Sequence, residues 1–133
     1  MRDMSTRAND ETSEIRQSLW MLTISPSIWA FHFLASYITA AIWCEKLAGR
    51  NGPLGSVRLM IAAYTVAALI GIGLNGWAGW KRHQFGSSTL PHDYDSPEDR
   101  HRFLGFATFL LAMLSVVATI FVASVALFFG DCR

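Results

Sequence analysis

Three long stretches of this 133-residue chain contain no Asp, Glu, Lys or Arg. They cover residues 17–44, 59–80 and 103–130. A soluble domain of this size would alternate apolar and charged residues along its helices, so the absence excludes an ordinary soluble fold. About 20 apolar residues at a rise of 1.5 Å span the hydrocarbon core of a bilayer, and each stretch is long enough. Because backbone groups in lipid must bond internally, and the stretches are too long for barrel strands, we predict helices.

The expected fold is therefore an all-α membrane protein with three transmembrane helices, over about 26–46, 57–81 and 97–130. Ser25–Pro26 matches an N-cap residue followed by proline at the first helical position, which places the start of the first span. One longer helix kinked at Pro26 is the alternative.

The residues before Pro26 are polar and of mixed charge, unlike a cleavable signal peptide. We expect a disordered cytoplasmic tail over 1–11 and a short interfacial helix over about 12–23. Residues 12–133 then form a single three-helix transmembrane domain.

Lys and Arg residues near the ends of the spans predict the orientation. Seven would flank one side and four the other: Arg2, Arg7, Arg16, Lys81, Arg82, Arg100 and Arg102 against Lys46, Arg50, Arg58 and Arg133. This bias favours a cytoplasmic N-terminus and a periplasmic C-terminus in a bacterial inner membrane. The net charge is only +1, and no basic stripe indicates a nucleic-acid partner.

Cysteine is scarce, with one residue at the end of the first span and one after the third, Cys44 and Cys132. Three crossings put both on the same face, which the predicted orientation makes the oxidising one, where disulfides persist. We therefore expect a disulfide. The alternatives are a Cu(I) site completed by Met60, because soft sulfur ligands suit that ion, and two unpaired thiols.

The three uncharged stretches, 17–44, 59–80 and 103–130, hold no carboxylate and a single histidine, His32. An ionisable residue within a membrane is a candidate functional residue, and a partner that could bond it should be sought. Counting residues from the predicted ends of the spans places Asn75 and Thr108 at a similar depth, so we expect these three to form an intramembrane polar layer. A haem ligand would need a second histidine in a span, and a proton relay would need carboxylates. The pattern favours a structural or partner-binding hydrogen bond.

Small and polar residues recur along one face of each predicted helix, as helices that pack in a bilayer require. The second span has a stripe at four-residue spacing: Ala63, Ala67, Gly71, Asn75 and Gly79. The first and third offer Ser25, Trp29, His32, Ser36, Thr39 and Trp43, and Thr108, Ala112, Ser115, Thr119 and Ala123. These faces predict a compact bundle.

Two segments, "SPSIWAFHFLASYITAAIWC" and "SPEDRHRFLGFATFLLAMLSVVATIFV", together with the terminal "DCR", resemble a group of small uncharacterised bacterial inner-membrane proteins. Those proteins are associated with haem–copper cytochrome c oxidase genes. The resemblance implies an accessory or assembly role beside a respiratory complex and carries no catalytic residue with it.

Enzyme motifs are lacking: the sequence has no Gly-rich phosphate loop, nucleophile elbow or His-Glu metal motif. The expected function is accordingly a non-enzymatic accessory subunit or assembly partner without a cofactor. A redox carrier of copper or haem and a small oligomeric transporter are the alternatives.

Overall fold

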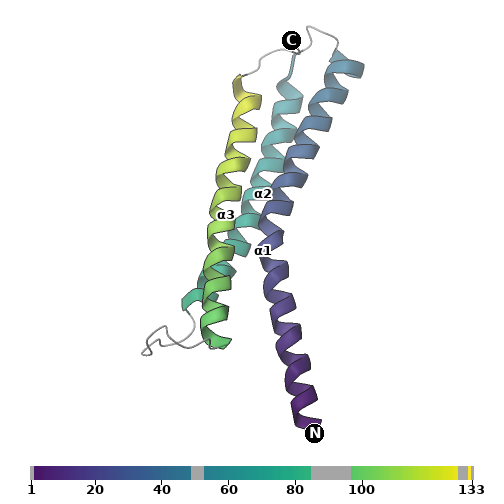
Figure 1. Cartoon of the computed structure of the whole chain (residues 1–133). Helices are drawn as coiled ribbons and strands as arrows, with labels where there is room; N and C mark the ends of the chain where they lie inside the picture. Colours follow the sequence, from purple (N-terminus) through teal and green to yellow (C-terminus); the bar gives the residue numbers. More distant parts are fainter. Residues whose placement is uncertain (1, 49–52, 85–96, 129–131, 133) are drawn as a thin grey trace.

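The computed structural model describes residues 2–48, 53–84, 97–128 and Cys132. These residues are almost entirely helical: α1 (Arg2–Ile42) continues into a short π-helical segment η1 (Trp43–Ala48), and α2 (Gly55–Gln84) and α3 (Pro97–Phe128) follow. The three long helices run side by side, each antiparallel to the next along the chain (Figure 1). We call the end of the bundle near Cys132 the disulfide end and the opposite end the N-terminal end.

Each long helix contains a segment that is long and apolar enough to cross a membrane: Leu19–Leu47, Gly55–Gln84 and Arg100–Phe128. This confirms the predicted class, an all-α protein with three transmembrane helices. The predicted second span, 57–81, lies inside α2, and the third begins at residue 97 as predicted. Residues 129 and 130 of the third prediction lie outside the described residues.

The first helix differs from its predicted form, because α1 runs unbroken from Arg2 through Pro26 to Ile42. The single long helix, which was the alternative, replaces the predicted tail over 1–11, the interfacial helix over 12–23 and the separate span beginning at 26. Ser25 does not cap a helix here. Its hydroxyl instead accepts a hydrogen bond from α2, so the Ser-Pro pair marks an interhelical contact within a continuous helix.

The interior of the bundle is rich in small polar side chains. The buried polar residues are Ser25, His32, Ser36, Asn75, Thr108, Ser115 and Thr119, and the buried apolar residues are Val57, Ile61, Ala68, Ile72 and Ala112. Large apolar side chains cover the outside instead, for example Phe31, Leu59 and Phe121. This distribution is what a bilayer requires, since lipid solvates the outer side chains and close packing joins the helices.

Helices α2 and α3 come into close backbone contact near the N-terminal end, where glycines face each other. A Cβ atom built on Gly105 would lie 2.9 Å from the carbonyl oxygen of Gly79 and 3.0 Å from the amide nitrogen of His83. One built on Gly76 would lie 2.9 Å from Cβ of Ala112. Only glycine permits this approach of two backbones.

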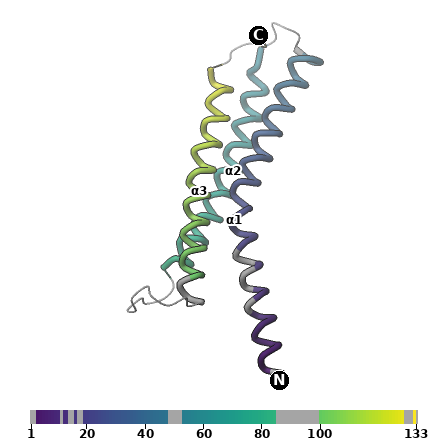
Figure 2. Tube along the Cα trace, in the orientation of Figure 1, coloured from purple at the N-terminus to yellow at the C-terminus, as the bar shows by residue number. Residues whose placement is uncertain are grey.

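Helix α1 lies beside α2 and α3 over its C-terminal part, and its N-terminal part extends beyond them (Figure 2). Described side chains in this extension are exposed from Asp3 to Asp10, and again at Thr12, Ser13 and Arg16. We call residues 2–18 the helical arm.

Candidate functional site

The candidate site is the polar face that α1 presents to α2. At its N-terminal end, the side-chain amide of Asn75 donates two hydrogen bonds, to Oγ of Ser25 at 2.8 Å and to the carbonyl oxygen of Met21 at 3.1 Å. Both amide hydrogens are therefore used across the interface. Ser25 is completely buried, so this pair fixes the register of α1 on α2 away from lipid.

His32 bonds to Thr65 of α2, with 3.0 Å between Nε2 and Oγ1. The Thr65 hydroxyl hydrogen is already donated to the carbonyl oxygen of Ile61 at 2.7 Å, as in many membrane helices. Oγ1 must then accept, and Nε2 of His32 must donate. A neutral imidazole consequently carries its proton on Nε2 and leaves Nδ1 as a bare acceptor.

The predicted polar layer of His32, Asn75 and Thr108 does not form, although all three residues are buried. Asn75 pairs with Ser25, seven residues before His32, which corresponds to about 10 Å along the helix axis at 1.5 Å per residue. The prediction failed because it took Pro26 as the start of the span. Once α1 extends beyond Pro26, residues near position 25 lie level with Asn75.

Thr108 contributes to helix packing without joining a polar layer. Its hydroxyl donates to the carbonyl oxygen of Leu104 in its own helix at 2.8 Å. Ser115, Thr119 and Ser124 make the same bond to the carbonyl four residues earlier. The hydroxyl groups on the polar face of α3 are thus hydrogen-bonded within their own helix. These side chains serve the interface through their small size, which allows close packing.

Four buried polar atoms have no hydrogen-bond partner among the described residues: Trp29 Nε1, His32 Nδ1 and Ser36 Oγ on α1, and Trp43 Nε1 at the start of η1. Ser36 differs from Thr65, Thr108, Ser115 and Thr119, whose hydroxyls each donate to the carbonyl oxygen four residues earlier. Buried polar groups normally find partners, so this face of α1 has unused capacity for hydrogen bonds.

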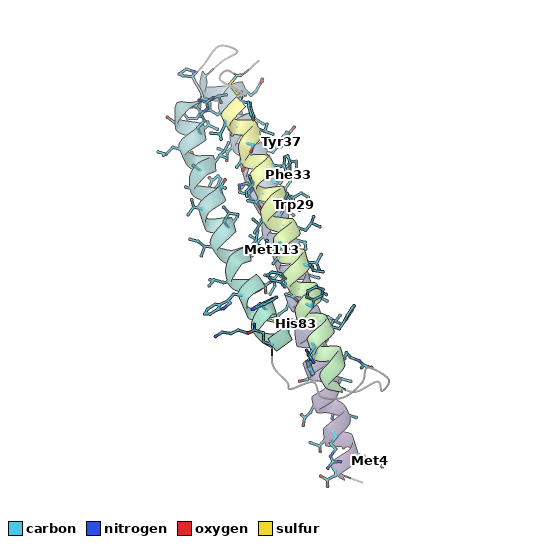
Figure 3. All side chains as sticks on the ribbon, turned by 90° about the vertical axis from the view of Figure 1, so that its left-hand side faces the viewer. Met4, Trp29, Phe33, Tyr37, His83 and Met113 are labelled. Atoms are coloured by element: carbon cyan, nitrogen blue, oxygen red, sulfur yellow. A yellow bond between two sulfur atoms is a disulfide. The ribbon has the colours of Figure 1, made fainter. Side chains whose placement is uncertain are left out.

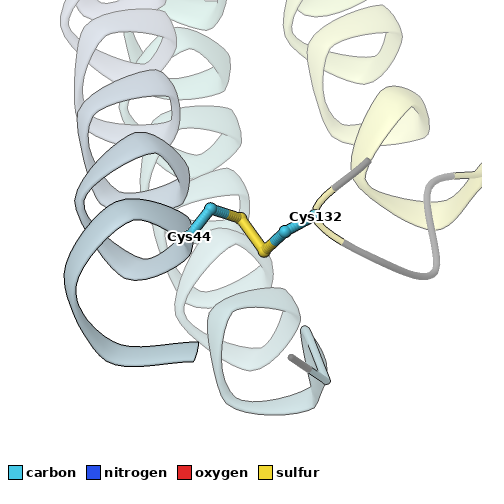
Figure 4. The surroundings of a disulfide bond; sticks show 2 residues. All are labelled: Cys44 and Cys132. Atoms are coloured by element: carbon cyan, nitrogen blue, oxygen red, sulfur yellow. A yellow bond between two sulfur atoms is a disulfide. The ribbon is translucent and has the colours of Figure 1, made fainter. Parts of the chain in front are cut away.

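The cysteines form the predicted disulfide at the disulfide end, with 5.5 Å between the Cα atoms of Cys44 and Cys132 (Figure 4). It ties the end of the first span to the residues that follow α3. Arg58 of α2 adds a second tie, since its Nε and Nη2 atoms donate to the carbonyl oxygens of Ala126 and Leu127 at 3.0 and 3.2 Å. These carbonyls end α3, where intrahelical donors are lacking.

The Cu(I) alternative needs two thiolates, and in this structure both sulfur atoms are bonded to each other. Met60, its third ligand, is 44% exposed on the outside of α2. The described residues contain no group of three or more His, Cys, Asp or Glu placed to hold a metal ion. Haem ligation through Nε2 of His32 would first require the bond to Thr65 to break.

The predicted packing stripe of α2 is correct in its C-terminal half and wrong in its N-terminal half. Gly79 and Asn75 are buried and Gly71 is partly buried, whereas Ala67 and Ala63 are exposed. Four residues rotate a helix by about 40° more than a full turn, so a strict four-residue stripe leaves the interface. The buried face is made instead by Val57, Ile61, Ala68, Ile72, Asn75, Gly76 and Gly79.

Three aromatic side chains of α1 stack in a ladder, which was not predicted from the sequence. The rings of Trp29 and Phe33 stack with centroids 6.5 Å apart, and those of Phe33 and Tyr37 with centroids 6.3 Å apart. Figure 3 shows the three side chains following one another along the helix. Phe33 and Tyr37 are exposed, so the ladder faces the bilayer or a membrane partner. Their four-residue spacing is the sequence signal that would have identified it.

A second aromatic cluster lies at the N-terminal end, between α2 and α3. The Trp80 ring lies 5.1 Å from that of Phe109, the His83 ring lies 5.2 Å from that of Phe106, and the Lys81 ammonium lies 4.3 Å from the Trp77 ring. Aromatic rings beside cationic side chains are typical of the membrane–water interface. This cluster therefore marks one boundary of the bilayer.

Comparison with known proteins gave no match: no family model fits the chain, and no curated protein or solved structure is significantly similar to it. The resemblance to oxidase-associated inner-membrane proteins stays a prediction.

Proposed function

We propose that this chain is a non-enzymatic accessory subunit or assembly partner of a bacterial respiratory membrane complex, in the first instance a cytochrome c oxidase. The observation that carries the proposal is the helical arm, residues 2–18, which extends past the other two helices (Figure 1). A helix with polar, exposed side chains has little stability of its own in water and gains it by packing. A partner surface supplies that packing.

The rest of the bundle supports a role in binding. Its interior is filled by helix–helix contacts and two interhelical hydrogen-bonding groups, Asn75 and His32, and a disulfide fixes one end. The exposed ladder of Phe33 and Tyr37 offers a membrane-level contact on the same helix as the arm. With seven basic residues flanking one side and four the other, the arm is cytoplasmic and the disulfide periplasmic.

Affinity purification of the full chain from bacterial membranes, followed by protein identification, tests the proposal. We expect oxidase subunits or their assembly factors to co-purify. Ala8→Pro breaks the arm and should lower their recovery, because proline removes a backbone donor and clashes within a helix. Ala8→Ser leaves the arm intact and serves as the matched control. Recovery of the chain alone, or with proteins unrelated to respiration, would contradict the proposal.

A further inference from the structure

Pro26 lies inside α1, about two turns beyond the helical arm. Proline has no N–H to donate to the carbonyl oxygen of Leu22, and its ring crowds that oxygen, so a proline inside a helix favours a kink. The helix nevertheless continues without a break from Arg2 to Ile42. Pro26 is therefore the point at which α1 bends most readily.

Asn75 of α2 holds the arm side of this weak point. Its amide donates to Oγ of Ser25 at 2.8 Å and to the carbonyl oxygen of Met21 at 3.1 Å, and both acceptors precede Pro26. His32 bonds to α2 on the other side of Pro26. The two groups thus fix α1 to α2 on opposite sides of the proline, and Asn75 fixes the half that carries the arm.

The helical arm would follow any bend at Pro26. Every residue from Asp3 to Asp10 is exposed, and these residues cover more than two turns and so all sides of the helix. No side of this part of α1 is therefore buried against another described helix (Figure 2). Ala8 lies about 27 Å from Pro26 along the helix axis, so a kink of about 20° moves it by about 9 Å.

The groups that Asn75 binds can also bond to each other. Met21 precedes Ser25 by four residues, and the hydroxyls of Thr65 and Ser115 donate to carbonyl oxygens at that spacing. Released from Asn75, the Ser25 hydroxyl can donate to Met21 in the same way. A serine bonded to its own helix in this manner often bends it. The segment before Pro26 thus has two hydrogen-bonded arrangements, one straight and one bent.

We propose that Asn75 is a latch across a hinge at Pro26. While Asn75 is bonded to Ser25 and Met21, the arm continues the line of α1, and when these bonds open the arm bends away. Hydrogen bonds between membrane helices are a modest constraint, because released groups find other partners. The latch can therefore open without unfolding the bundle.

This inference rests on the proposed function, because it concerns the regulation of the arm that binds the partner. The free chain holds the arm straight. A partner that binds the bent arm more tightly opens the latch to the extent of that difference in affinity. Asn75 consequently sets the direction in which the arm is offered to a partner.

Electron spin resonance distances between labels on Ala8→Cys and Gln84→Cys test the hinge in the full chain in lipid nanodiscs; both positions are exposed. We expect a narrow distribution of distances with the latch intact. Asn75→Leu should broaden it and displace part of it by up to about 9 Å. Adding Pro26→Ala, which restores the backbone donor, should narrow it again. A general loss of stability would not be reversed in this way.

Two controls separate a hinge from general loosening. Labels on Ala41→Cys and Ser56→Cys, both exposed, report on the disulfide end and should give the same distribution in every variant. Ser27→Ala removes an exposed serine next to the proline and should leave the distances to the arm unchanged.

Non-reducing mass analysis confirms that each variant has formed the Cys44–Cys132 bond, so that only the introduced cysteines carry labels. If Asn75→Leu fails this check, Ser25→Ala takes its place. An unchanged arm distribution in the folded latch variant would overturn the proposal. So would broadening that persists with Pro26→Ala or extends to the disulfide end. The chain is measured without a partner, so failure of the hinge and failure of the proposed function are seen in separate experiments.

Discussion

The side-chain amide of Asn75 lies 2.8 Å from Oγ of Ser25, across the interface between α1 and α2 and out of contact with lipid. The same amide nitrogen reaches the carbonyl oxygen of Met21, just before Pro26. Proline has no N–H and leaves the carbonyl of Leu22 without its usual helical donor. Asn75 thus anchors α1 to α2 beside the proline inside α1.

Asn75→Leu should lower the stability of the bundle, because it removes both bonds and leaves Ser25 buried without a partner. A hydrogen bond between membrane helices contributes about 0.5–1.5 kcal/mol, and we expect a loss in this range. Thermal or denaturant unfolding in detergent measures it. In a double-mutant cycle, Ser25→Ala should add little to Asn75→Leu, whereas Ser27→Ala should be neutral in both backgrounds. Full additivity of Ser25→Ala and Asn75→Leu would show that they are not coupled.

The tautomer of His32 is a second prediction. The Thr65 hydroxyl hydrogen goes to Ile61, so the imidazole should carry its proton on Nε2. Nitrogen chemical shifts of the labelled histidine, measured by NMR, distinguish the two tautomers. Thr65→Val removes the acceptor and should change the Nε2 signal and lower stability by about 1 kcal/mol. A proton on Nδ1 in the wild type would contradict the structure.

Glycine substitutions should differ sharply with position. Gly105→Ala places Cβ against the backbone of Gly79 and His83, so the helices must separate. Overpacking of this kind costs about 1–3 kcal/mol, measurable in unfolding experiments. Gly73→Ala is the control, because nothing lies within 4 Å of its added Cβ. Equal stability of the two variants would mean that α2 and α3 do not approach at Gly105.

Loss of the disulfide should loosen the disulfide end while the N-terminal end keeps its packing. Cys44→Ser should lower the free energy of unfolding by about 2–4 kcal/mol on a scale derived for proteins in water. Hydrogen exchange should increase near Phe128 and remain unchanged near Gly105. Faster exchange at both ends alike would show that the bond holds the whole bundle rather than one end.

The sequence was sufficient to predict the number of spans, the disulfide and the polar faces of α1 and α3. The spans follow from the bilayer, which requires uncharged helices. The disulfide follows from the odd number of membrane crossings, which brings Cys44 and Cys132 to one face. The burial of Ser25, His32 and Ser36 follows from helical periodicity alone. None of these features requires the contacts between helices to be known.

The hydrogen-bond partners of the buried polar side chains could not be predicted, because they depend on the axial register of α1 relative to α2. A Ser-Pro pair is compatible with a helix start and with a helix interior, and the choice between them shifts α1 by about two turns relative to α2. Thr65, rather than Asn75, therefore lies level with His32 and bonds it. The stripe of α2 failed at Ala63 for a related reason, since an unbroken spacing of four does not follow a 3.6-residue helix.

The central claim is that the chain crosses the membrane three times, so that the arm and the C-terminal end of α2 share one face and the start of α2 lies on the other. Labelling with a membrane-impermeant maleimide tests it, using single cysteines introduced at the exposed positions Ala8, Ser56 and Gln84 while Cys44 and Cys132 stay bonded. The account predicts that Ala8→Cys and Gln84→Cys react from the same compartment and Ser56→Cys only from the opposite one. Reaction of Ser56→Cys and Gln84→Cys from one compartment would contradict it.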